Sequence, residues 1–426
     1  MRNHKFHIVL FFLVTLLLVG CDSITGSKQD QTTQEIFDAG RSDPQLINEV
    51  EYVPLFPFFT KGGDGQELQN PKDIYVGYDE LIYVVDDRGL HVLDEAGRGA
   101  AFIPIVGGGT SVIQDRRLHV YVTSRRDTLL NGRMWNLPVV IRYADISTGN
   151  PRVADRIWHP FDDDSRRFNR PDPIDSDEEV SFTGVGVIFD NHVYVSRRGP
   201  INARSTVILP HNTVMEFDEN GINLQSIVTL HPSRPSLRSS VFPTDVATFV
   251  HPPQQSFFEQ SRHFLIAQSP SADDILSGGL PVSNPLRFAL LSIRVVFTSD
   301  GVEYRPDTQM LQTAADPSRG DSFLYDEFKF LNPTDITIAA DGTNFIFVTD
   351  AGTNKLHIFT GQGIEGVTPP PGSNSSVPVN VSFGGLGDGA KQFRSPQGVS
   401  YFRRIVYVAD TGNNRISRFR LNTDFE

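Results

Sequence analysis

The sequence contains a single cysteine, Cys21, among 426 residues. An intramolecular disulfide is therefore excluded, and so is a zinc site built on paired cysteines. The chain also lacks a Ser-His-Asp order, a phosphate-binding loop and a helical metal motif. The sequence therefore gives no recognisable catalytic motif, and stability must come from packing alone.

Positive charge is also scarce, because 38 Lys and Arg residues face 51 Asp and Glu residues, for a net charge of −13. Nucleic-acid binding depends on lysine and arginine that neutralise phosphates. We therefore expect no nucleic-acid partner. Long hydrophobic runs are missing too, since the longest, from Ile8 to Val19, is too short to span a bilayer comfortably.

That short run has the marks of an export signal. It follows the basic start MRNHK and ends at Leu18-Val19-Gly20-Cys21. A basic start and an apolar core of 7–15 residues are typical of secretory signals. Leu-Val-Gly-Cys resembles the lipobox of bacterial lipoproteins, which implies that Cys21 is lipidated and anchors an exported protein to the cell membrane or outer membrane. The alternative is an ordinary signal with a cysteine nearby.

The most informative feature that is present is a repeat of three short strands. It is clearest in residues 379–421, where a glycine-rich turn precedes apolar runs at Gln397–Tyr401, Ile405–Ala409 and Ile416–Leu421. Similar segments begin at Gly62 and Phe328, and three weaker copies complete the series. The repeats are anchored just before or within their first strands at Pro71, Gly109, Phe182, Pro243, Pro333 and Pro396. Their second strands hold Tyr83, Tyr121, Tyr194, Leu265, Phe347 and Tyr407.

One such meander is too small to bury a core, so the copies must pack against one another. Six copies predict an all-β fold, a six-bladed β-propeller. The glycine-rich turn, the Tyr-Val-Ala-Asp of 407–410 and the Asn-Arg-Ile of 414–416 resemble NHL repeats. The resemblance is strong over 379–421, good over 323–361 and 55–97, and weak over 98–322. It implies the same propeller and no particular reaction.

The last repeat ends after its third strand, near Leu421. The segment Glu51–Phe59 precedes the first repeat and has no other partner. We expect it to complete the last blade, because this closure removes an exposed sheet edge. The predicted organisation is a signal peptide at 1–20, lipidated Cys21 with a flexible tether at 21–50, and the propeller at 51–426.

Three long segments follow the second strands of neighbouring repeats, at 124–138, 196–212 and 268–287. Strands of a meander alternate in direction, so we expect these segments to be loops gathered on one face, where function usually lies. Two of them carry the arginines Arg125, Arg126, Arg133, Arg197, Arg198 and Arg204. Arginine suits contacts with carboxylate or phosphate, so this face is predicted to bind a protein, a glycan or a small anionic ligand. The alternative is that the arginines pair with the acidic run 162–179.

Asp73, Asp245 and Asp335 share one position at the start of the innermost strand of three repeats. Oxygen ligands gathered on the axis of the ring could hold a hard cation such as Ca²⁺. The alternative is that each carboxylate accepts backbone N–H bonds at the start of its strand. No other cofactor is expected.

Two functions of different classes remain open. The first is a non-catalytic binding or scaffolding propeller on the bacterial envelope, since the scaffold is complete and catalytic motifs are missing. The second is a propeller enzyme, a hydrolase or lyase of lactonase type with a metal on the central axis. An enzyme should place several convergent polar side chains on the inner ring, and the sequence offers only the three aspartates.

Overall fold

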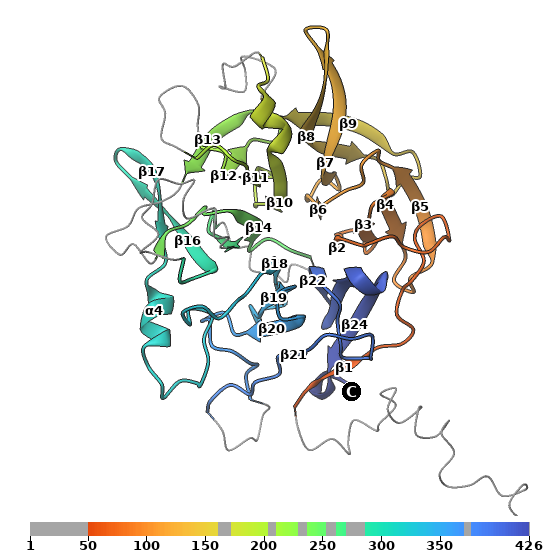
Figure 1. Cartoon of the computed structure of the whole chain (residues 1–426). Coiled ribbons are helices and arrows are strands. Elements are labelled where there is room, and N and C mark those ends of the chain that lie inside the picture. Colours follow the sequence, from red (N-terminus) through yellow and green to blue (C-terminus); the bar gives the residue numbers. More distant parts are fainter. Residues whose placement is uncertain are drawn as a thin grey trace, which may run out of the picture. The chain divides into compact units, whose positions relative to one another are not determined.

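The computed structural model describes residues 50–160, 172–202, 210–228, 237–252, 261–269, 286–369 and 376–425. In these ranges, all strands from β1 to β24 belong to six antiparallel sheets of four strands each. The sheets are arranged around a common centre (Figure 1), which confirms the predicted six-bladed propeller.

The blades follow one another along the chain. Blade 1 contains β2 (Asp73–Val76), β3 (Ile82–Val85), β4 (Gly89–Leu93) and β5 (Gly99–Pro104). Blade 2 contains β6 (Ser111–Gln114), β7 (Val120–Leu130), β8 (Arg133–Ala144) and β9 (Arg152–Trp158). Blade 3 contains β10 (Ser181–Val187), β11 (Val193–Arg198), β12 (Thr213–Phe217) and β13 (Asn223–Val228).

Blade 4 contains β14 (Pro243–Thr248), β15 (Phe264–Gln268), β16 (Leu290–Thr298) and β17 (Gly301–Pro306). Blade 5 contains β18 (Pro333–Ile338), β19 (Ile346–Asp350), β20 (Lys355–Phe359) and β21 (Phe383–Gly384). Blade 6 contains β22 (Pro396–Phe402), β23 (Ile405–Asp410), β24 (Arg415–Leu421) and β1 (Tyr52–Pro54). Short helical segments are α4 (Gln309–Ala314), η3 (Asp175–Glu179), η5 (Thr411–Asn413) and η6 (Asn422–Asp424).

The first strand of each blade lies nearest the centre, where it contacts the first strands of both neighbouring blades. The second strands form the core between blades, because their β-branched and aromatic residues are buried on both faces. The six predicted second-strand residues, from Tyr83 to Tyr407, are each at most 3% exposed. The outer strands β5 and β17 are mostly exposed.

The predicted closure of the ring is confirmed. Strand β1 pairs antiparallel with β24, so that Tyr52 lies opposite Leu421 and Pro54 opposite Phe419. Tyr52 is 2% exposed, and its ring packs against Phe347, 6.1 Å away between centroids. The two chain ends of the propeller therefore share one blade.

Threonine hydroxyls link successive blades around the centre, a feature the sequence analysis did not predict. Each donates to the carbonyl of the anchoring residue of the next blade. The bonds are Thr110 to Phe182, Thr183 to Pro243, Thr244 to Pro333, Thr334 to Pro396 and Thr411 to Pro71. In the junction from blade 1 to blade 2, Asp73 Oδ2 instead accepts the backbone N–H of Val112 at 2.7 Å.

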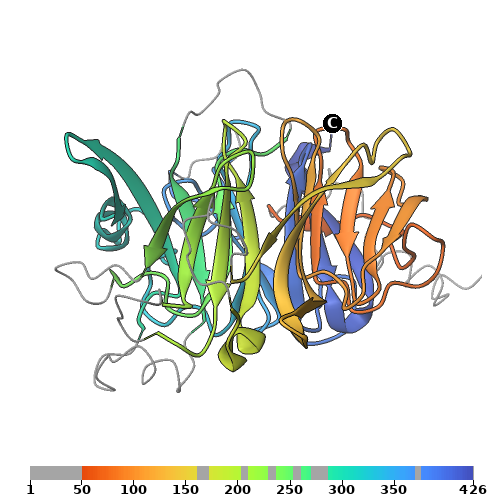
Figure 2. The same cartoon turned by 90° about the horizontal axis from the view of Figure 1, so that it is seen from above.

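The segment 124–138 is not the loop that was expected. Strands β7 and β8 continue through it as one hairpin, paired from Val120 opposite Tyr143 to Leu130 opposite Arg133. The turn residues Asn131 and Gly132 both have positive φ, at 49° and 79°. This Asn-Gly turn suits the twist of two antiparallel strands, and it was the sequence signal for a hairpin. Figures 1 and 2 show the hairpin leaving the ring beside the η3 turn.

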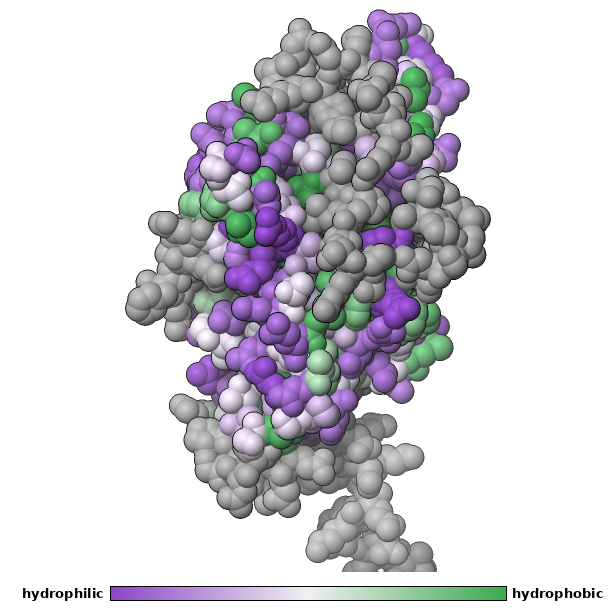
Figure 3. Space-filling view, turned by 90° about the vertical axis from the view of Figure 1, so that its left-hand side faces the viewer, coloured by the Kyte–Doolittle hydropathy of each residue, from purple (hydrophilic) through white to green (hydrophobic). Residues whose placement is uncertain are grey.

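The outer surface is mainly polar. Figure 3 shows hydrophilic residues over most of the coloured surface, with hydrophobic residues scattered among them. Phe297 on β16, for example, is 70% exposed. Within the described ranges, no helix has both the length and the apolar character needed to cross a bilayer.

Candidate functional site

Two arginines of the predicted rim contact the acidic segment instead of lining an open surface. Arg133 forms ion pairs with Asp175 at 2.7 Å and Glu178 at 3.2 Å, and it also lies over the Trp135 ring. Arg125 donates to the backbone carbonyls of Glu178 and Val180. This is the pairing that the sequence analysis left open as the alternative. Ion pairs and hydrogen bonds to backbone carbonyls therefore hold the hairpin against η3 and the residue that follows it.

Arg197 is a larger departure from the prediction, since it is only 2% exposed. Its guanidinium donates to the carbonyls of His211 and Pro210, both at 3.0 Å. Strand β11 carries it into the interior because Arg197 pairs with Phe182 of β10 and Thr213 of β12. It therefore cannot belong to a surface rim.

The remaining rim arginines are placed separately. Arg126 is half-buried on β7, and Arg198 lies over the Phe242 ring at 4.9 Å. Arg204 lies outside the described residues, as do 203–209 of the segment 196–212 and 270–285 of the segment 268–287. Of the five described arginines, Arg197 is buried, and Arg125 and Arg133 contact the acidic segment. Anion binding by this face stays a prediction.

Behind Arg197, the side chains of His159, Asp177 and His211 meet. One possible ligand atom of each lies within 4.8 Å of the others, and all three residues are buried. In the described part of the chain, no other group of three His, Cys, Asp or Glu residues comes this close. Histidine nitrogen and carboxylate oxygen are the donors that zinc and iron use, so this set could hold a metal ion.

Arg197 opposes that use. Its Nη1 lies 3.1 Å from His159 Nδ1, and a guanidinium can only donate, so the ring proton must lie on Nε2. Nε2 in turn donates to Asp177 Oδ1 at 2.9 Å. A metal ion bound to Nε2 would have to replace this proton, and it would bring a second positive charge close to the Arg197 guanidinium. The contacts favour a hydrogen-bonded chain from arginine through histidine to aspartate, in which the two buried charges compensate each other.

The three predicted axial aspartates do lie on first strands, but they serve the backbone. Each bonds the first strand of the following blade: Asp73 accepts from Val112 at 2.7 Å, Asp245 from Ile336 at 3.2 Å and Asp335 from Val399 at 2.6 Å. Asp73 and Asp335 also accept the N–H of the next residue in their own strand, Ile74 and Ile336, both at 2.7 Å. These bonds are the alternative given for the aspartates, and the bonds from the neighbouring blade add to them. Their oxygens are not among the compact ligand groups of the described residues. A calcium ion on the axis stays a prediction.

Burial raises the pKa of these carboxyl groups, and for Asp73 and Asp335 repulsion from the other aspartates adds to the effect. The pKa of Asp73 rises to about 7 and that of Asp245 to about 6, while the pKa of Asp335 lies well above its usual range. The space between them is a cavity of about 20 Å³, which has room for about one water molecule. The axis is therefore narrow, protonated in part near neutral pH, and closed to a substrate.

These pKa shifts predict a pH-dependent stability to which all three aspartates contribute, and Asp245→Asn should remove the part that belongs to Asp245. The folded protein holds the proton of Asp245 up to a higher pH than the unfolded chain does. The resulting stabilisation is fully present at a pH below the ordinary carboxyl pKa, and it is lost as the pH rises through about 6. From pH 5 to pH 8 the wild type should lose about 1 kcal/mol relative to Asp245→Asn. Urea unfolding of both proteins at the two pH values measures this. His251, whose pKa is lowered by burial, is common to both proteins and cancels. If the difference in unfolding free energy between the two proteins is the same at pH 5 and at pH 8, the raised pKa of Asp245 is contradicted.

A much larger hollow, which we call the side pocket, lies away from the axis and has a volume of about 670 Å³. It is lined by Phe249 of blade 4 and by 318–319, 343–344 and 360–364 of blade 5 and its flanks, with Thr368 and Ser376. The turns 343–344 and 360–364 follow the first and third strands of blade 5. Because the strands alternate, the side pocket faces opposite to the β7–β8 hairpin.

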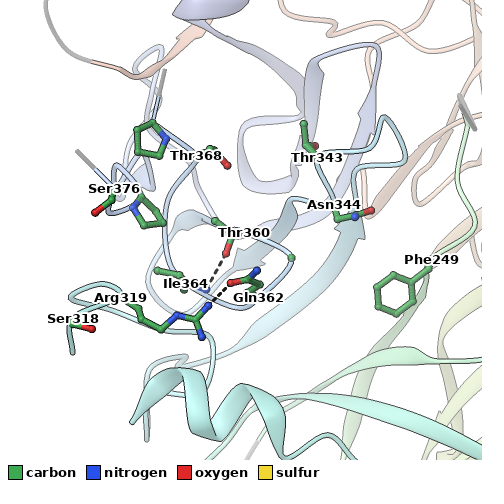
Figure 4. Close-up of a pocket in the computed structure, with 13 residues that line it drawn as sticks. Phe249, Ser318, Arg319, Thr343, Asn344, Thr360, Gln362, Ile364, Thr368 and Ser376 are labelled. Atoms are coloured by element: carbon green, nitrogen blue, oxygen red, sulfur yellow. Dashed lines mark hydrogen bonds between the residues drawn. The ribbon is translucent and has the colours of Figure 1, made fainter. Parts of the chain in front are cut away.

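Among the described residues that line the side pocket, Arg319 is the only charged one. Figure 4 shows its guanidinium beside Gln362, to which it donates, and Nη1 lies 3.3 Å from the hydroxyl oxygen of Thr313. No carboxylate of the described residues lies within ion-pair distance of it. The sequence analysis missed this residue because no repeat position or charge run distinguishes it.

Solved structures of similar shape have diverse descriptions. Virginiamycin B lyase from Staphylococcus aureus is 11% identical, with a TM-score of 0.41 over 88% of this chain and 100% of that one. An auxiliary nutrient binding protein from Bacteroides ovatus is 11% identical, with a TM-score of 0.48 over 88% of this chain and 77% of that one. A gluconolactonase from Xanthomonas campestris is 9% identical, with a TM-score of 0.43 over 91% of this chain and 92% of that one. At this distance they carry no argument about function.

No curated protein matches the sequence. Residues 393–419, which include β22, β23 and most of β24, match the family model of the NHL repeat. This match confirms the resemblance that was strongest in the same part of the sequence. The chain carries an NHL repeat within a six-bladed β-propeller.

Proposed function

We propose that this chain is a non-catalytic binding protein of the bacterial cell envelope, anchored to a membrane through lipidated Cys21, with its ligand in the side pocket. The observation that carries the proposal is the contrast in size between the axial cavity and the side pocket, both formed by described residues. The axial cavity measures about 20 Å³ and the side pocket about 670 Å³, and binding sites for small molecules usually measure about 300–1,000 Å³.

The chemistry of the side pocket supports binding without catalysis. Its described lining contains no Asp, Glu, His, Cys, Lys or Tyr, so it provides no general base and no activated nucleophile. It does provide hydroxyl and amide groups, from Ser318, Thr343, Asn344, Thr360 and Gln362. Such groups hold and orient a polar ligand.

One observation favours the alternative, an axial enzyme. Groups with shifted pKa values gather at active sites, and the three axial aspartates have such values. Yet their oxygens are occupied by backbone N–H groups, and the cavity beside them admits no substrate. We therefore place the axial aspartates among the groups that hold the ring together.

A panel of glycans and sugar lactones tests the proposal. Wild-type protein, the pocket-filling variant Ser318→Trp and the axial variant Asp335→Asn are each incubated with the panel, and binding and chemical conversion are measured together. We expect a bound compound that is recovered unchanged, with binding lost in Ser318→Trp and kept in Asp335→Asn. Conversion of a compound that depends on Asp335 would replace this proposal with the axial enzyme.

The anchor gives a separate prediction. Cys21→Ala should move the protein from the membrane fraction to the soluble or unprocessed fraction, because a lipid chain is the proposed attachment. Metabolic labelling with palmitate and fractionation of cells measure the effect. Lipid label and membrane association that persist in Cys21→Ala would show that the cysteine is not the anchor.

A further inference from the structure

We infer that the side pocket recognises an acidic sugar, with the anionic group of the sugar on Arg319 and its hydroxyl groups on the neutral side chains around it. This inference rests on the proposed function and names the class of ligand. It also moves the expected anion site from the face of the long segments to the opposite face.

The electrostatic argument starts from Arg319. Its two recorded partners, Gln362 and Thr313, are neutral, so its charge is not compensated by an ion pair within the described residues. The nearest acidic residues in the chain are Asp321 and Asp316. Asp316 accepts bonds from the N–H and hydroxyl of Ser318, and the charge of Arg319 contributes to lowering the pKa of Asp316 without forming an ion pair with it. Glu365, which follows the pocket residue Ile364, pairs with Lys329 at 2.7 Å. A carboxylate ligand would therefore meet one cation and no unpaired competing acid in the pocket lining.

The partners of Arg319 also hold its side chain in place. Gln362 lies in the turn after β20, and that turn is closed by the bond from the backbone N–H of Ile364 to the Thr360 hydroxyl at 3.2 Å. A guanidinium fixed in this way can present its remaining N–H groups to a planar carboxylate, and such charge-assisted bonds are the strong ones. The pocket is thus preorganised for one anionic group.

The rest of the lining suits a ligand that carries hydroxyl groups better than it suits an apolar ligand. Hydroxyl and amide groups of Ser318, Thr343, Asn344, Thr360 and Gln362 line the same pocket, with Gln362 beside Arg319 and with Thr343 and Asn344 on the far side (Figure 4). Their number suits a ligand with several hydroxyl groups, because each ligand hydroxyl needs a partner once it leaves water. The volume of about 670 Å³ admits a sugar of one or a few rings. One anionic group together with several hydroxyl groups describes a uronic acid.

The test uses D-galacturonate as the probe, with D-galactose as its neutral counterpart and inorganic phosphate as a bare anion. Calorimetric titration should give tighter binding of galacturonate than of either comparison. Arg319→Gln should weaken galacturonate binding about ten- to hundredfold and leave galactose binding unchanged, and Arg319→Lys should restore part of the loss. The matched control is Arg98→Gln, which removes the same charge from an exposed pair with Asp94 on blade 1.

Each other outcome overturns the inference. Equal binding of galacturonate and galactose would show that the cation is not used, and equal binding of phosphate would show a simple anion site. No galacturonate binding at millimolar concentration would exclude the sugar class. The proposed function would survive that failure if another compound of the glycan and lactone panel still bound in wild type and not in Ser318→Trp.

Discussion

Deleting residues 50–59 should lower the free energy of unfolding of the propeller by about 5 kcal/mol or more. The deletion removes the buried side chains of Tyr52, Val53 and Phe59, and each large apolar side chain contributes about 1.5–3 kcal/mol. It also removes the partner of β24, so that this strand becomes an exposed edge. We expect a lower melting temperature and a greater tendency to aggregate, measured by thermal unfolding and light scattering.

Two controls separate closure from a general effect of shortening. Deletion of residues 22–45 should leave the melting temperature almost unchanged, as expected of a tether. Within the strand segment, Tyr52→Ala should be strongly destabilising, whereas Phe56→Ala should not, because Phe56 is 48% exposed and Tyr52 only 2%. If both deletions lower the stability equally, the strand exchange does not hold the ring closed.

Arg197→Met should cost about 3–5 kcal/mol of the free energy of unfolding. The guanidinium is buried and linked through His159 to Asp177, so its loss removes a positive charge from a buried hydrogen-bonded chain that ends on a carboxylate. It also leaves the carbonyls of Pro210 and His211 without their donor. Urea unfolding at neutral pH measures the cost.

The double variant Arg197→Met, Asp177→Asn distinguishes charge compensation from simple packing. If the two charges compensate each other, the double variant should lose clearly less unfolding free energy than the two single variants lose together. The neighbouring Arg198→Met, with a half-buried side chain, should cost about 1 kcal/mol or less. Strict additivity of Arg197 and Asp177 would contradict the hydrogen-bonded chain through His159.

The sequence predicted the fold because the repeat determines the register of every blade. The six anchoring residues all lie within the first two residues of a first strand or two residues before it, and the second-strand residues from Tyr83 to Tyr407 are buried. The unpartnered segment Glu51–Phe59 was enough to predict closure by β1. These features depend on local pattern and on the need to bury apolar faces, and both can be recognised in one sequence.

The site could not be predicted in the same way, because it depends on which side chains meet across blades. Ser-Arg-Arg occurs at 124–126 and again at 196–198, yet Arg125 binds carbonyls near η3 and Arg197 is buried against His211. Only the register of β11 between β10 and β12 directs Arg197 inward. The long β7–β8 hairpin was also missed, although its Asn131-Gly132 turn was a usable signal.

The aspartates of the first strands show how one position can suggest two roles. Their shared position correctly predicted that they lie around the axis. Whether they bind a cation or the backbone depends on the distance to the neighbouring first strand, which the sequence does not contain. The bonds from Val112, Ile336 and Val399 give the carboxylates backbone partners. The side pocket likewise arises from turns 343–344 and 360–364, which no repeat rule distinguishes.

The most direct test is a proton NMR titration of trigalacturonate with wild-type protein, followed over a day in the same sample. Binding in the side pocket without catalysis predicts broadened sugar signals, no broadening with Arg319→Gln, and no new signals from a converted sugar. Broadening that persists in Arg319→Gln, or new signals that appear with wild type and disappear with Asp335→Asn, would contradict it.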